Sequence, residues 1–141
     1  MTEFPRWAAA AAVAVSLAAC AMSDEGATSS APAMTRDTAV GSVLTDPQGM
    51  TLYTLSNDEG GKSSCSGRCA KLWPPFLAPA DAAPAGRWSL TRRDDGTRQW
   101  AYAGKPLYLW TKDKRPGDVT GDKYGDVWWA ALNSNEFILV H

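Results

Sequence analysis

The chain is poor in the residues from which most active sites are built. Its 141 residues include a single histidine, His141, and three cysteines. It contains no nucleophile elbow, no metal-binding histidine pair, no phosphate-binding glycine loop and no second histidine for a catalytic triad. The sequence therefore predicts no catalytic residues and no enzyme, and it favours a binding or structural module.

An excess of charge of one sign is also missing. Fourteen Lys and Arg residues stand against fifteen Asp and Glu residues, which gives a formal net charge of −1. These residues are spread along the chain without blocks, so no basic surface for nucleic acid or anionic lipid is expected. We therefore expect no nucleic-acid partner.

The N-terminal apolar run, Trp7–Ala19, is too short for a stable membrane span. As a helix it would reach roughly 20 Å, whereas the hydrocarbon core of a bilayer is about 30 Å thick. A short head, Met1–Arg6, precedes the run, and this order is typical of a cleaved export signal. Residues 1–19 are therefore predicted to be a signal peptide.

The end of this signal, Leu17-Ala18-Ala19-Cys20, looks like a lipobox, in which the cysteine is acylated with chains such as palmitate and then becomes the N-terminus. The alternative is an ordinary secretory cut beside Ala19 or Ala21, which leaves Cys20 without a role. Several acyl chains anchor a protein stably where one does so only marginally. Lipidation of Cys20 thus predicts a membrane-bound envelope protein, at the outer membrane of a Gram-negative cell because no acidic retention signal follows.

A tether and one small domain are expected after the signal. Residues 20–39 are rich in Ala, Ser and Thr without an apolar period, which predicts a flexible segment. Residues 40–141 suffice for a single domain with one core. We expect this domain to be mainly β.

Two parts of this domain are alike at an offset of 55 residues. Gly49–Asp58 and Gly104–Asp113 align without gaps, and both read G-x-x-L-Y-x-x-x-x-D. The same offset aligns a tryptophan further along each copy. Two copies are too few for an open solenoid. The sequence therefore predicts two related halves, about 41–76 and 96–131, that pack together around a shared core.

Each half begins like a β-hairpin with a turn that contains glycine. Alternation places Tyr53 and Tyr108 on one face of their strands and Leu52 and Leu107 on the other, so both faces are expected to be covered. One short helical turn is expected near 68–72, before a pair of prolines. The expected strands are 43–45, 51–55, 87–91, 99–102, 106–110, 127–132 and 137–140.

These motifs together resemble a family of bacterial secreted-repeat lipoproteins with a Y-x-[FWY]-x-x-D motif. Tyr108–Asp113 fits the motif in full, whereas Tyr53–Asp58 has Leu55 at the aromatic position. The likeness extends over roughly residues 41–130. It implies membership of a lipoprotein family without an established biochemical function. A Trp-His pair is usual late in the second repeat, and here it is replaced by Trp128-Trp129.

Cys65 and Cys69 are the only cysteines that follow Cys20. An oxidising compartment favours a disulfide between them. The alternative is a redox dithiol, or a soft metal site in which the two thiolates share a Cu(I) ion. A periplasmic redox or copper-handling protein is therefore the alternative function. Otherwise no cofactor and no metal are expected.

Aromatic residues and motif acids are the candidates for binding a small ligand or another envelope protein. Some tryptophans must be core, but of two adjacent ones in a strand, one faces outward. An outward Trp129 near Tyr108 or Trp110 would stack on a sugar ring or another flat ligand. Acids just past the strand ends either fix a turn or contact the ligand. The candidate ligand surface comprises Tyr53, Asp58, Tyr108, Trp110, Asp113 and Trp129.

Overall fold

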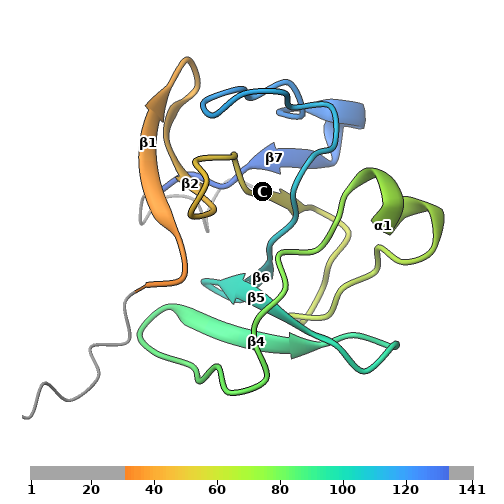
Figure 1. The fold of residues 1–141 in the computed structure, drawn as a ribbon. Coiled ribbons are helices and arrows are strands. Elements are labelled where there is room, and N and C mark those ends of the chain that lie inside the picture. Colours follow the sequence, from red (N-terminus) through yellow and green to blue (C-terminus); the bar gives the residue numbers. More distant parts are fainter. Residues whose placement is uncertain (1–30, 134–141) are drawn as a thin grey trace, which may run out of the picture.

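The computed structural model describes residues 31–133, and these residues form a mainly β domain (Figure 1). Its elements are β1 (Met34–Thr38), β2 (Gly41–Thr45), β3 (Tyr53–Leu55), α1 (Arg68–Leu72), β4 (Trp88–Arg92), β5 (Arg98–Tyr102), β6 (Lys105–Pro106), the 3-10 turn η1 (Tyr124–Asp126) and β7 (Trp128–Ala130). The expected fold class and the helical turn at 68–72 are confirmed. The signal peptide, Cys20, His141 and the strand predicted at 137–140 lie outside the described residues.

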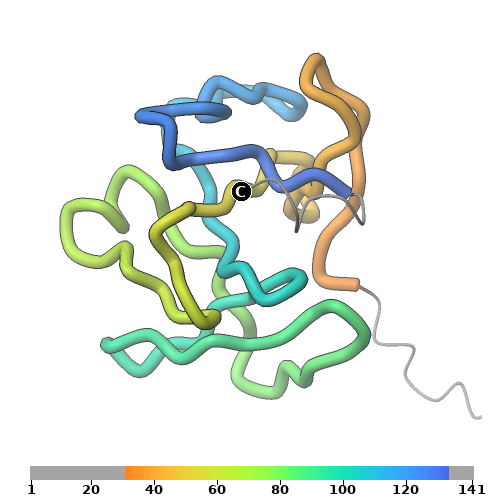
Figure 2. Tube along the Cα trace, turned by 180° about the vertical axis from the view of Figure 1, so that it is seen from behind, coloured from red at the N-terminus to blue at the C-terminus, as the bar shows by residue number. Residues whose placement is uncertain are grey.

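The strands form three small antiparallel sheets. β1 pairs with β2, β5 pairs with both β4 and β6, and β3 pairs with β7. The β1–β2 hairpin lies beside β7, and the β4–β5 hairpin lies at the other end of the domain (Figures 1 and 2). Hairpin β1–β2 in the first half thus corresponds to hairpin β4–β5 in the second.

Strand β1 lies within the segment that the sequence assigned to the tether. Its residues, Met34–Thr38, are mostly polar and exposed. The strand is held by main-chain pairing with β2 rather than by burial of its side chains. A search for apolar periodicity could not find such a strand. The domain already includes Met34, so the predicted boundary at residue 40 is wrong.

The two halves exchange their last segments. β3 of the first half pairs with β7 of the second, and the N–H of Ser56 donates to the carbonyl of Val127 at 2.8 Å. The equivalent bond at the offset of 55 is made by Thr111, which follows Ser56 by 55 residues, and Leu72, which precedes Val127 by 55: the N–H of Thr111 donates to the carbonyl of Leu72 at 3.1 Å. The segment that follows α1 therefore crosses to the second half, as β7 crosses to the first. The β3–β7 sheet therefore takes one strand from each half.

The exchange is centred on the two motif tyrosines. The N–H of Tyr53 donates to the carbonyl of Tyr108 at 2.8 Å, and the N–H of Tyr108 donates back to the carbonyl of Tyr53 at 2.9 Å. Each residue thus bonds to its own counterpart at the offset of 55. Approximate twofold symmetry requires such reciprocal bonds on its axis. The prediction of two related halves packed together is confirmed.

The central strands contact two separate cores, one on each face. Tyr53 and Tyr108 belong to the first core, whereas Leu52 and Leu107 belong to the second. The predicted alternation is therefore confirmed. The other buried members of the first core are Val43, Leu55, Cys65, Trp73, Trp110, Trp128 and Ala130, and those of the second are Leu44 and Ala131.

Candidate functional site

The two motif tyrosines bond to the carboxylates of opposite halves. The Tyr53 hydroxyl donates to Asp113 Oδ2 at 2.6 Å, and the Tyr108 hydroxyl donates to Asp58 Oδ2 at 2.6 Å. The tyrosine and the aspartate of one motif are therefore not partners of each other. The pKa of Tyr53 and that of Tyr108 are raised well above the ordinary range of tyrosine, mainly by burial and in second place by the hydrogen bond to the carboxylate.

The second oxygen of each carboxylate holds a loop of its own half. Asp58 Oδ1 accepts from the N–H and the hydroxyl of Ser64, both at 2.7 Å. Asp113 Oδ1 accepts in the same way from Thr120, at 3.0 Å and 2.5 Å. Both carboxylates thus join a turn in one half to a tyrosine in the other, which agrees with the turn-fixing alternative.

The predicted ligand surface is wrong for five of its six residues. They are between 0 % and 6 % exposed, and they lie in the interior: Tyr53, Asp58, Tyr108, Trp110 and Asp113. The reason is the strand exchange, because it covers both faces of the motif strands. Of the six, Trp129 alone is partly exposed.

Trp129 lies on the outer side of β7, as alternation predicts. Its neighbour Trp128 is 5 % exposed and packs edge-on against Tyr108, with 5.1 Å between ring centroids. Tyr108 and Trp110 are interior residues, so an outward platform that combines them with Trp129 does not form. The indole N–H of Trp129 instead donates to Ser56 Oγ at 2.8 Å, which fixes the orientation of the ring.

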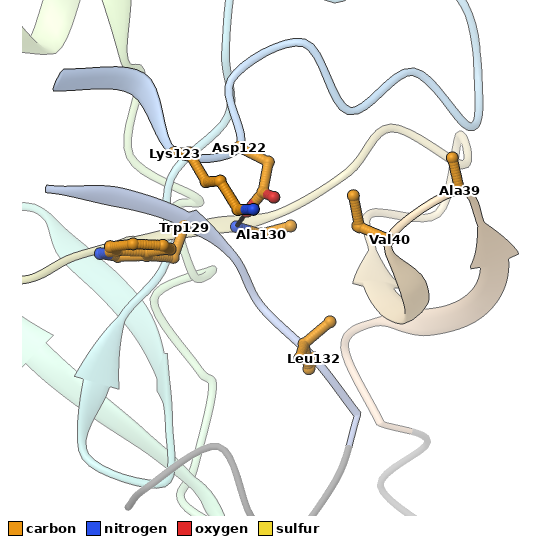
Figure 3. A pocket seen from close by; sticks show the side chains of 7 residues that line it. All are labelled: Ala39, Val40, Asp122, Lys123, Trp129, Ala130 and Leu132. Carbon is orange, nitrogen blue, oxygen red and sulfur yellow. Dashed lines mark hydrogen bonds between the residues drawn. The ribbon is translucent and has the colours of Figure 1, made fainter. Parts of the chain in front are cut away.

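A cavity of about 370 Å³ lies beside Trp129, between β7 and the turn that joins β1 to β2 (Figure 3). Trp129, Lys123 and Asp122 stand on one side of it, and Ala39 and Val40 stand opposite, with Leu132 at the base in this view. Ala130 completes the lining. The cavity therefore combines an aromatic face and two charged groups with an apolar wall.

The two charged groups come from the loop before η1. Asp122 Oδ1 accepts from the N–H of Ala130 at 2.9 Å, which places the carboxylate against β7. Lys123 is exposed and has a left-handed backbone with φ 66°. Only the Trp129 contribution to this cavity could be found in the sequence, through the paired tryptophans. The two charged residues look like ordinary loop residues.

Arg93 is a buried cation that sequence reasoning missed. Its guanidinium donates to Ser63 Oγ at 2.9 Å, to Gln99 Oε1 at 2.8 Å and to the carbonyl of Cys65 at 2.7 Å. Ser63 Oγ lies 2.6 Å from the hydroxyl oxygen of Tyr108. Arg93 is therefore linked through the Ser63 hydroxyl to the Tyr108–Asp58 pair. Its place in the sequence, next to an Asp-Asp-Gly turn, predicts exposure rather than burial.

Cys65 and Cys69 are joined in a disulfide, with 5.2 Å between their Cα atoms, so the predicted pairing is confirmed. Cys65 is 1 % exposed, and Cys69 packs against the first core. A Cu(I) site at this pair would require the bond to be reduced first, because the ligands of the ion are thiolates. Residues 31–133 contain no group of three or more His, Cys, Asp or Glu side chains placed to hold a metal ion.

Comparison with known proteins finds one family. The model of a family described as a secreted repeat of unknown function matches the chain twice, over residues 34–76 and 89–132. These two matches coincide with the two halves of the structure, and the first one includes β1. No curated protein and no solved structure matches the chain. Among the described residues, no helix is long and apolar enough to cross a membrane.

Proposed function

Because the chain belongs to this family of secreted repeats, whose function is unknown, we propose that it is a lipid-anchored envelope protein whose β-domain binds a ligand without catalysis. Membership itself indicates an extracellular or envelope location. The lipobox at Cys20 supports the anchor, and the missing retention signal supports the outer membrane of a Gram-negative cell.

The interior polar groups support a binding role rather than a catalytic one. Each motif tyrosine bonds to a carboxylate, and Arg93 bonds to three oxygen atoms. Within residues 31–133, every buried side-chain nitrogen or oxygen has a hydrogen-bond partner. A general acid or base must reach a substrate proton. The buried carboxylates of Asp58 and Asp113 already accept hydrogen bonds from a loop of their own half and from a tyrosine of the other half.

The cavity beside Trp129 is the observation that carries the proposal. Ligand sites are typically concave and largely apolar, with a few polar groups that orient the ligand. The fixed indole of Trp129 offers a flat face for the C–H side of a sugar ring. The Asp122 carboxylate can accept hydrogen bonds from sugar hydroxyls, and the Lys123 ammonium can donate to them. The ligand proposed is therefore a saccharide of the cell envelope.

Titration with neutral and acidic oligosaccharides, followed by NMR of the tryptophan indole N–H signals, tests this assignment. Binding should shift the Trp129 signal, and Trp129→Ala should abolish binding. Trp88→Ala is the matched control, because Trp88 is also partly buried but lies in the second core, away from the cavity. Binding by Trp129→Ala that equals the wild type would overturn the proposal.

A second arm tests whether the chain fills its own cavity. Leu132 lines the cavity, and the sequence from 136 to 140, EFILV, is largely apolar. The same titration is therefore run on a chain that ends at Asn133. If the shortened chain binds the saccharide and the full chain does not, a saccharide is rejected as the native occupant, and the cavity is assigned to the C-terminal segment.

A further inference from the structure

A continuous column of aromatic rings runs through the first core. Trp73 stacks on Trp128, with ring centroids 3.8 Å apart and planes at 3°, and on Trp110, at 3.9 Å and 23°. Tyr124 packs on Trp110 at 4.9 Å and is 49 % exposed. Tyr108 meets Trp128 edge-on at 5.1 Å. These five residues are called the aromatic column below.

The column joins the surface to both buried tyrosine–carboxylate pairs. Tyr108 is its inner end, and Tyr53 contacts its middle, with 5.4 Å between the ring centroids of Tyr53 and Trp73. The three tryptophans of the column are no more than 5 % exposed, and Tyr53 and Tyr108 are 0 % exposed. The route therefore passes from solvent at Tyr124 to two phenols that solvent does not reach.

The inner ends have the groups that oxidation of tyrosine requires. Loss of one electron makes a phenol a strong acid, so its proton must leave with the electron. A carboxylate accepts that proton if it lies within hydrogen-bond distance. Asp113 Oδ2 and Asp58 Oδ2 each lie 2.6 Å from a phenol oxygen. Neither tyrosine needs to move, and no water molecule is needed, for the proton to transfer.

We propose that the aromatic column carries one-electron oxidation from the surface to Tyr53 and Tyr108. The phenol O–H bond breaks, the proton goes to Asp113 or Asp58, and the electron passes through the stacked tryptophans to an oxidant at the Tyr124 face. That oxidant is a carbonate or peroxyl radical, or a high-potential metal complex, and it is reduced by one electron. The product is a neutral tyrosyl radical beside a protonated carboxyl group. This role uses neither the cavity nor Trp129.

A photochemical oxidant placed at the column tests the proposal. Lys112 Nζ lies 5.6 Å from the centroid of the Trp110 ring, so the variant Lys112→His holds a ruthenium polypyridyl complex next to the column. Asp81→His places the same label on the exposed segment between the halves. Both variants also carry His141→Gln, so that each chain has one histidine. A flash in the presence of an external electron acceptor then generates ruthenium(III).

The label at position 112, in a chain that also carries Tyr124→Phe, should produce a tyrosyl radical, and its formation should slow in deuterium oxide because a proton moves with the electron. The label at position 81 should give only the background yield. Trp73→Phe, with the label at 112, should lower the yield to that background, provided that circular dichroism shows the native fold. The isotope effect needs no buried substitution. A radical that stays on tryptophan, or a tyrosyl yield equal from both labels, would overturn the proposal.

Discussion

Removal of the Tyr53 hydroxyl should cost about 1.5–3 kcal/mol of unfolding free energy, the usual range for a hydrogen bond to a charged group. In Tyr53→Phe, Asp113 Oδ2 loses its donor at 2.6 Å, and the carboxylate is only 6 % exposed. Water therefore replaces the lost bond poorly. Approximate symmetry predicts a similar loss for Tyr108→Phe, because Asp58 is 3 % exposed.

Urea unfolding with the disulfide intact measures this loss, because the midpoint should fall while the slope stays unchanged. Tyr102→Phe is the matched control, since Tyr102 packs against the second core and belongs to neither of the two tyrosine–carboxylate pairs. A change within about 0.5 kcal/mol is expected for that variant.

A double-mutant cycle separates pairing across the halves from pairing within a motif. Tyr53→Phe and Asp113→Asn should be coupled by about 0.5–3 kcal/mol, because these two side chains share a bond. Tyr53→Phe and Asp58→Asn lie in one motif but share no bond, so their effects should add. Coupling between Tyr53 and Asp58 instead, with additivity between Tyr53 and Asp113, would refute the exchanged arrangement.

Four further measurements bear on the anchor, the core, the disulfide and alkaline stability. Cys20→Ala should release the protein from membrane fractions and abolish labelling by a palmitate analogue; retention in those fractions would exclude this anchor. Gly121→Ala should cost about 1–3 kcal/mol, because a Cβ there would lie 2.7 Å from a ring carbon of Trp73; an unchanged urea midpoint would contradict this packing. Cys65 and Cys69 should resist thiol reagents in the native protein, since Cys65 is 1 % exposed; rapid exchange would favour the redox alternative. The raised pKa of the two motif tyrosines keeps their contribution to stability constant below about pH 10, the unfolded value, and lowers it above that pH, because only unfolded chains release these protons; tyrosinate absorbance equivalent to all four tyrosines of the chain before unfolding would contradict this.

The sequence predicted features that depend on local pattern. The offset of 55 identified equivalent residues, and alternation correctly assigned Leu52 and Leu107 to a face opposite to the tyrosines. The spacing and the compartment predicted the disulfide between Cys65 and Cys69. Each of these follows from neighbours in the chain.

The features that sequence reasoning missed depend on which distant segments meet. The spacing of tyrosine and aspartate is the same whether a motif bonds within itself or to its copy, so the sequence could not reveal the crossed pairs. Burial of Trp110 follows from the crossing and was missed with it. Strand β1 lacks an apolar face, so the sequence did not predict a strand there. Arg93 stands beside a turn signal, so the sequence did not predict its burial.

The exchange of strands makes this chain equivalent to a homodimer whose two subunits have been joined. A chain with one repeat would carry every donor and acceptor of the central bonds, but it would meet their partners only in a second copy. Repeats of this kind should therefore fold in even numbers, either within one chain or by the pairing of two single-repeat chains.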